Sequence, residues 1–167
     1  EKLVSGMRNR GYDEIFARQI YHQILGFGEY GFPESHAASF ALLVYVSAWL
    51  KHHEPAAFTC ALLNSQPMGF YAPSQLTQDA RRHGIEIQPA DVTVSNWDCT
   101  LEQVDGNHAI RLGLRMVKGL SRNGGEGLTA ARIQRPLRDI DDLAHRAQLN
   151  QADLQALAAA GALKSLV

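Results

Sequence analysis

Five consecutive residues form the pattern in this sequence that is best suited to holding an anion: Val117-Lys118-Gly119-Leu120-Ser121. Glycine lets a turn approach a phosphate closely, and the amides at the start of a following helix would point at it. A turn of this kind, between two short helices, contacts phosphates rather than base edges, so it would bind DNA without sequence preference. The residues expected to contact DNA are Arg115, Lys118, Gly119, Leu120, Ser121 and Arg122. The same pattern also fits an ordinary helix end followed by a solvated loop.

The charge around this turn is locally basic, although the whole chain has a formal net charge of −1. Between positions 108 and 135 there is one acid, Glu126, and the basic residues are Arg111, Arg115, Lys118, Arg122, Arg132 and Arg135. A basic block inside a neutral chain indicates a local anionic partner.

A second candidate site lies at Ser35 and His36, where a loop containing Pro33 runs into a long helix. A helix N-terminus can hold an anion, here a nucleotide phosphate. The same two residues also fit a capping serine beside a half-buried histidine, and caps are commoner than sites. The helix that follows is apolar on almost every side, so we expect it to be buried.

The acids and cysteines predict neither a metal site nor a catalytic residue in this chain. Asp139 and Asp141 could hold metal ions if they lay on a strand. They precede a helical run, however, so we interpret them as helix caps. Cys60 and Cys99 are isolated in the sequence, which is typical of a reducing compartment and does not support a zinc site.

The spacing of apolar residues, prolines and glycines predicts a mainly α chain with a small antiparallel β patch. We expect helices over about 2–10, 13–25, 36–53, 55–64, 73–83 and 128–133, then one ending near 147 and one over 151–160. The expected strands are 85–87, 100–104 and 109–112, the last two joined by a turn at 105–107. The glycine-rich segment 121–127 reads as a loose polar loop. No apolar run is long enough to span a membrane.

Residues 30–58 carry a recognisable combination of motifs. They are Tyr30-Gly31-Phe32-Pro33-Glu34-Ser35-His36-Ala37-Ala38-Ser39-Phe40-Ala41-Leu42, then Trp49-Leu50-Lys51, His53, Pro55 and Phe58. This combination resembles the fingers region of bacterial C-family DNA polymerases, the alpha subunits of DNA polymerase III. The similarity continues through Arg82-His83-Gly84-Ile85, Pro89, Trp97-Asp98, Gly113-Leu114 and Val117-Lys118-Gly119 to Ala160-Gly161-Ala162-Leu163. Pro33-Glu34 and the loop 64–71 resemble the error-prone, damage-inducible branch.

The resemblance implies that the parent protein adds nucleotides on a template during translesion synthesis and DNA repair. It implies that Ser35 and His36 lie near the incoming nucleotide. The Mg²⁺ of the parent enzyme would be held by a palm domain outside this chain, so the chain alone would be inactive. The implied partners are DNA, deoxynucleoside triphosphates and, through regions outside the chain, a sliding clamp and other mutagenesis proteins. The implied location is the bacterial cytoplasm.

The resemblance also divides the chain into three parts, and two rival interpretations of its function remain. It implies a helical fingers region at 1–84, a β-containing connector at 85–112 and a tandem helix-hairpin-helix that grips DNA at 113–167. Ser121 and the glycine-rich insert depart from the usual hairpin pattern. The rivals are a stand-alone DNA-binding helix-hairpin-helix module and a helical protein-interaction domain with the loop 67–73 as its docking surface. The chain opens without an initiator Met, so we expect it to be a piece of a longer protein.

Overall fold

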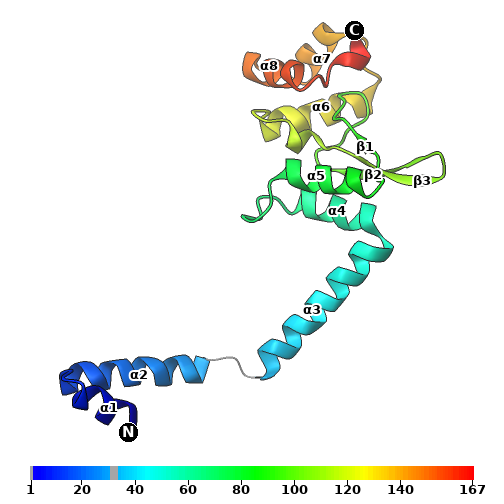
Figure 1. The fold of residues 1–167 in the computed structure, drawn as a ribbon. Helices are drawn as coiled ribbons and strands as arrows, with labels where there is room; N and C mark the ends of the chain where they lie inside the picture. The colour runs from blue at the N-terminus through cyan, green and yellow to red at the C-terminus, as the bar shows by residue number, and fades with distance from the viewer. Residues whose placement is uncertain (1, 31–33) are drawn as a thin grey trace. The chain divides into compact units, whose positions relative to one another are not determined.

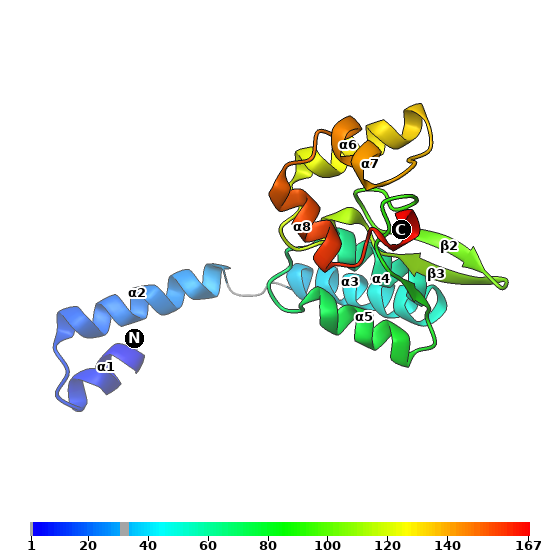
Figure 2. The same cartoon turned by 90° about the horizontal axis from the view of Figure 1, so that it is seen from above.

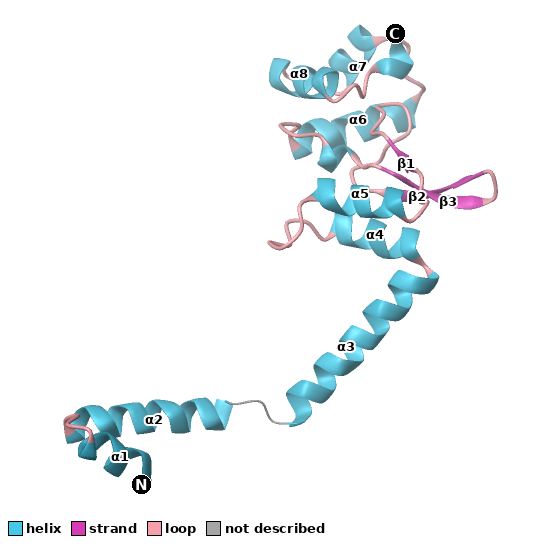
Figure 3. Ribbon diagram, viewed as in Figure 1, coloured by secondary structure: helices cyan, strands magenta, loops and turns pink. Residues whose placement is uncertain are grey.

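The computed structural model describes the backbone of residues 2–30 and 34–167, and the side chains of residues 2–26 and 37–167. Most of these residues are helical (Figure 3). They form two compact units, 1–48 and 49–167. The predicted division into 1–84, 85–112 and 113–167 concerns the functional roles of these parts, not compact structural units. It stays a prediction.

The first unit begins with two paired helices, α1 (Lys2–Asn9) and α2 (Glu14–Tyr30). Gly11 allows the turn between them because its φ is +87°, in the region that favours glycine. Asp13 caps α2: its Oδ2 accepts hydrogen bonds from the amides of Ile15 at 2.9 Å and Phe16 at 3.3 Å. The predicted break and cap are both confirmed.

Helix α3 (Glu34–His53) is apolar around its circumference but is not buried. Every described side chain from 37 to 53 is exposed, and Leu42 and Tyr45 are 64% and 69% accessible. The prediction of a buried helix was therefore wrong for the structure described. An apolar sequence indicates that a helix needs a packing partner, but it does not indicate which segment provides that partner. Across the described stretches, no helix is both long and apolar enough to cross a membrane.

The second unit contains a small sheet packed on two helices, α4 (Pro55–Asn64) and α5 (Pro73–Arg82) (Figure 1). Its strands are β1 (Ile87–Gln88), β2 (Thr100–Val104) and β3 (Asn107–Arg111), in the order β1-β3-β2. The core between helices and sheet consists of Ala56, Cys60, Leu63, Ala80, Ile85, Cys99 and Ile110. Pro55 opens α4 as expected.

The predicted antiparallel pair is present, and a third strand pairs with it in parallel, so the sheet is mixed. β2 and β3 are antiparallel and are joined by Asp105 and Gly106, both with positive φ, as expected for a tight hairpin. This hairpin projects from the rest of the unit in both views (Figures 1 and 2). β1 pairs with β3 in parallel. A hairpin turn fixes the direction of neighbouring strands only, and the long connection from β1 to β2 carries no such signal.

The remaining helices of this unit form a second core. They are the 3₁₀ turn η1 (Leu114–Met116), α6 (Arg122–Gln134), α7 (Ile140–Arg146), α8 (Gln151–Ala159) and the 3₁₀ turn η2 (Lys164–Leu166). The buried side chains of this core, which also include residues from the connecting segments, are Val92, Leu114, Leu128, Ala131, Leu143, Ala147, Leu157, Ala162 and Leu163.

The glycine-rich segment forms the first turns of α6, so the prediction of a loose loop there was wrong. A Cβ on Gly124 would lie 2.8 Å from Asp153 Oδ2, and one on Gly125 would lie 2.5 Å from Trp97 Cε3. A Cβ on Gly127 would lie 2.6 Å from the Ala147 carbonyl oxygen. Each glycine costs about 1 kcal/mol of helix propensity. Here the glycines allow Asp153, Trp97 and Ala147 to approach the helix backbone, and this packing determines that the segment is helical.

Candidate nucleic-acid interface

The pattern Val117–Ser121 forms a hairpin between η1 and α6. The Leu120 amide donates to the Val117 carbonyl at 3.2 Å, and Gly119 has φ +90°. Ser121 is the N-cap of α6, and its Oγ accepts from the Gly124 amide at 3.0 Å. The element before the hairpin is a single 3₁₀ turn rather than an α-helix.

A second hairpin with the same local plan joins α7 to α8. Gln148 has φ +52° and takes the place that Gly119 has in the first hairpin, two residues before the helix cap. Asn150 is the N-cap of α8, and its Oδ1 accepts from the Asp153 amide at 2.8 Å. The region is therefore a tandem helix-hairpin-helix, as predicted. No glycine marks this second hairpin in the sequence, because Gln148 occupies the left-handed position.

The two hairpins pack on each other's helices. A Cβ on Gly119 of the first hairpin would lie 3.7 Å from the Cβ of Ala156 in α8. In return, Ala147 of the second hairpin approaches α6 so closely at Gly127 that a Cβ there would not fit. Gly127 and Ala156 each lie six residues beyond the cap of their helix. The contacts are thus reciprocal, and they fix the two hairpins relative to each other.

One carboxylate joins the two helix N-termini. Asp153 in the first turn of α8 is only 3% exposed. Its Oδ1 accepts a hydrogen bond from the Ser121 amide at 2.8 Å, and its Oδ2 accepts one from Ser121 Oγ at 3.1 Å. Negative charge is favoured at a helix N-terminus. Asp153 thus supplies an internal anion at the start of α6, a role that sequence reasoning missed because nothing local marks it.

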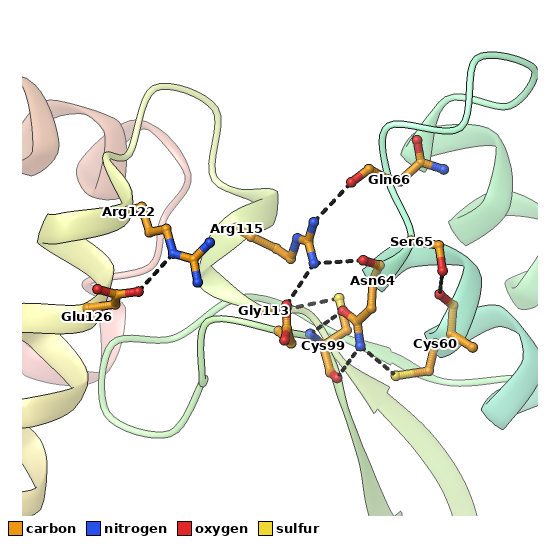
Figure 4. Close-up of polar contacts among 11 residues, drawn as sticks. Cys60, Asn64, Ser65, Gln66, Cys99, Gly113, Arg115, Arg122 and Glu126 are labelled. Atoms are coloured by element: carbon orange, nitrogen blue, oxygen red, sulfur yellow. Dashed lines mark hydrogen bonds and ion pairs between the residues drawn. The ribbon is translucent and has the colours of Figure 1, made fainter.

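Arg115, one of the predicted DNA contacts, cross-links two parts of the unit (Figure 4). Its Nη1 donates to the Asn64 carbonyl and to Asp98 Oδ1, both at 2.7 Å, and its Nη2 donates to the Gln66 carbonyl at 3.0 Å. The guanidinium therefore ties η1 to the end of α4 and to the loop beyond it. Whether it also contacts DNA stays a prediction.

Lys118 and Arg122 are the predicted cations that lie exposed at the first hairpin. Arg122 is 73% accessible, and its Nε donates to Glu126 Oε1 at 2.8 Å, one helical turn on. Lys118 forms no ion pair with the residues described. Leu120 instead packs against the core and anchors the hairpin.

Most of the other arginines of the basic block serve contacts within the protein. Arg111 pairs with Glu102 at 2.8 Å, and Arg135 pairs with Asp142 at 2.6 Å. Arg132 Nη1 donates to the carbonyls of Ser95 at 2.8 Å and Val92 at 3.2 Å. The cations left open to an outside anion are therefore Lys118, which is exposed, and Arg122, whose side chain stays 73% accessible beside Glu126.

Asp139 and Asp142 serve capping and ion pairing at the start of α7. Asp139 Oδ1 accepts from the Asp142 amide at 2.7 Å, which confirms the capping interpretation. Asp142 also pairs with Arg146 at 3.0 Å. Burial raises the pKa of Asp142, but hydrogen bonds from Arg135, the Arg138 amide and Arg146 outweigh it and lower the pKa to about 2. These oxygens are engaged, and the residues described hold no group of three His, Cys, Asp or Glu side chains able to hold a metal ion.

The backbone of Ser35 and His36 lies in the first turn of α3, as the sequence predicted. Their side chains lie outside the described residues, as does the loop 31–33 before them. The proposed nucleotide contact at these two residues stays a prediction.

Comparisons with known proteins match both the hairpin region and the whole chain. Residues 84–167 match the family model of the helix-hairpin-helix motif. The chain is 64% identical over 167 residues to the error-prone DNA polymerase of Alkalilimnicola ehrlichii. It is 60% identical over 185 residues to that of Methylococcus capsulatus and 59% over 172 residues to that of Pseudomonas syringae pv. tomato.

These alignments cover 99%, 99% and 100% of this chain, but only 16%, 18% and 17% of the three polymerases. The chain thus spans about one sixth of the length of the curated relatives it matches. The resemblance to C-family polymerases and to their error-prone branch is confirmed.

Proposed function

The chain belongs to the helix-hairpin-helix motif family, and we propose that it is the segment of an error-prone DNA polymerase that grips duplex DNA through its phosphates. The observation that carries this proposal is the reciprocal packing of the two hairpins, with Asp153 bonded to Ser121 between them. Two turns held at a fixed spacing can contact one duplex without rearrangement, so little ordering free energy is lost on binding.

The proposed contacts are the side chains of Lys118 and Arg122 together with the hairpin backbone at Gly119. The first two are exposed, and glycine leaves the backbone at Gly119 accessible to a phosphate oxygen. Ser121 acts as the cap and as the partner of Asp153, while Leu120 seats the hairpin on the core. Arg115 contributes indirectly, by holding the loop after α4 through its hydrogen bond to the Gln66 carbonyl. Phosphate contacts carry no sequence information, so the grip is independent of DNA sequence.

The whole protein's activity is proposed to be template-directed nucleotide addition, in the bacterial cytoplasm. Ser35 and His36 would lie near the incoming deoxynucleoside triphosphate, and contacts with a sliding clamp would use regions outside this chain. Mg²⁺ would be held outside it too. Asp139, considered above with Asp141 as a metal ligand, does not fit the ion because it caps α7, and the neighbouring Asp142 is paired with two arginines.

The salt dependence of DNA binding tests the proposal in the full-length protein. Each phosphate neutralised contributes about 0.9 to the slope of log affinity against log salt concentration. Lys118→Ala and Arg122→Ala should each flatten the slope by about that amount. Arg82→Ala is the matched control, because Arg82 is an exposed cation at the end of α5. Slopes that stay unchanged in both hairpin variants would contradict the proposal.

A further inference from the structure

We infer that the loop between α4 and α5 is a stacking platform for an unpaired base next to the duplex held at the first hairpin. This inference rests on the proposed function. The loop, residues 65–72, has the sequence Ser-Gln-Pro-Met-Gly-Phe-Tyr-Ala and contains no charged residue. It contains two consecutive aromatic residues, Phe70 and Tyr71.

Phe70 and Tyr71 are unusually exposed for their size. Phe70 is 90% accessible and Tyr71 is 59% accessible, whereas aromatic rings commonly contribute to a core. A consecutive pair of exposed rings offers flat apolar faces, and every nucleobase has a face that can stack on them. The chemical class of ligand that this pair fits is therefore an unpaired nucleobase.

The loop is held in place by hydrogen bonds at both ends. The Gln66 side chain spans it: Nε2 donates to the Tyr71 carbonyl at 3.3 Å, and Oε1 accepts from the Met68 amide at 3.3 Å. At its far end the Ala72 amide donates to Gln75 Oε1 at 2.9 Å. Arg115 binds the Gln66 carbonyl from outside the loop. The rings are thus presented on a braced backbone, which reduces the ordering cost of stacking.

Arg115 places this loop beside the first hairpin (Figure 4). A hollow of about 350 Å³ at their junction is lined by Gln66, Pro67, Pro73, Arg115 and Met116. Lys118 follows Met116 by two residues, so its backbone lies within about 7 Å of this lining. Single-stranded nucleic acid binds where aromatic faces adjoin cations that track the backbone. A protein partner that buried Phe70 in a pocket would explain the exposed rings, but it would not explain the exposed cations beside them.

The test uses the full-length protein and two DNA probes. One is a blunt duplex, and the other is the same duplex with a single-stranded overhang that carries 2-aminopurine at its first unpaired position. Phe70→Ala and Tyr71→Ala should each weaken binding of the overhang probe about tenfold and leave the blunt duplex unaffected. Phe70→Trp should restore binding and quench the 2-aminopurine fluorescence. Ile133→Ala is the control, because Ile133 is 79% exposed on α6 and is not part of the loop.

The outcomes separate this inference from the proposed function. Equal affinity of Phe70→Ala and the unaltered protein for the overhang probe would overturn the stacking platform, while Lys118→Ala would still weaken both probes. A melting temperature that falls in Phe70→Ala without a probe-specific change in affinity would overturn it too, because the ring would then pack against protein. If Lys118→Ala changes neither probe, the hairpin grip itself fails.

Discussion

The Ser121 amide donates a hydrogen bond to Asp153 Oδ1 at 2.8 Å, and this contact ties the N-terminus of α6 to that of α8. The two residues are 32 positions apart in the sequence. Ser121 Oγ bridges the pair because it donates to Asp153 and also accepts from the Gly124 amide. The tandem hairpins therefore share one buried polar cluster, and its integrity sets their relative placement.

Loss of this carboxylate should destabilise the hairpin region. Asp153→Ala leaves the Ser121 amide and hydroxyl without their partner, and we expect it to cost about 1–3 kcal/mol in the free energy of unfolding. Urea denaturation of the full-length protein measures it. Asp141→Ala is the matched control because Asp141 is an exposed acid in the first turn of α7, where a change within about 0.5 kcal/mol is expected. Equal effects of the two substitutions would contradict the role of Asp153.

A methyl group on Gly125 should clash with one particular ring. Its Cβ would lie 2.5 Å from Trp97 Cε3, so Gly125→Ala is expected to cost about 1–3 kcal/mol of stability. Phenylalanine lacks the outer ring of the indole, so Trp97→Phe should relieve the clash. The double variant should therefore lose less stability than the sum of the single ones, by more than about 0.5 kcal/mol. Strict additivity in a thermal or urea melt would show that the ring is not the obstacle.

The ion pairs of Asp142 should make stability fall in acid. The folded-state pKa, about 2, lies below the ordinary value of 3.8, so the folded state favours the charged form. The contribution of these pairs is complete above pH 3.8 and is lost as the pH falls towards 2. Melting temperatures measured between pH 5 and 2 should fall more steeply in the unaltered protein than in Asp142→Asn, so that the two curves converge. Parallel curves would be inconsistent with this linkage.

Replacement of Arg115 should loosen the loop that it holds. Arg115→Lys keeps the charge but cannot reproduce the fork that reaches two carbonyls and a carboxylate. We expect faster hydrogen exchange of the amides in residues 65–72, with little change in the β2–β3 hairpin. Exchange rates that stay the same throughout the loop would count against the cross-link.

Both cysteines should resist thiol reagents while the protein is folded. Burial, together with nearby Cys99 and Asp98, raises the pKa of Cys60 to about 11, and burial also raises that of Cys99. At pH 8 about one Cys60 thiol in a thousand would be ionised. Ellman's reagent should therefore react slowly in native buffer and fully in urea. Rapid reaction of Cys60 in the native protein would rule out its burial.

The features that the sequence could predict are those marked locally. Pro55 and Gly84 mark the ends of helices through their own backbone preferences, and Gly84 has φ +78° at the end of α5. Asp105 and Gly106 fix a hairpin in the same way. At the site, the first hairpin was found because Gly119 marks its turn.

The features that were missed depend on partners distant in the sequence. Helix α6 includes its glycines because Trp97, Ala147 and Asp153 pack against them. The cross-link made by Arg115 was missed because its three acceptors lie 17 to 51 residues away. The second hairpin was expected only from the family resemblance, because Gln148 rather than a glycine occupies its left-handed position.

The exposed apolar surface of α3 has a consequence for the behaviour of the separate chain in solution. Leu42, Leu43 and Tyr45 are each at least 60% accessible, and apolar patches of this kind drive association. A 167-residue polypeptide of this sequence is therefore expected to form oligomers whose size grows with concentration. Charged substitutions such as Leu43→Lys would disperse them, so this helix decides whether the segment can be handled as a monomer.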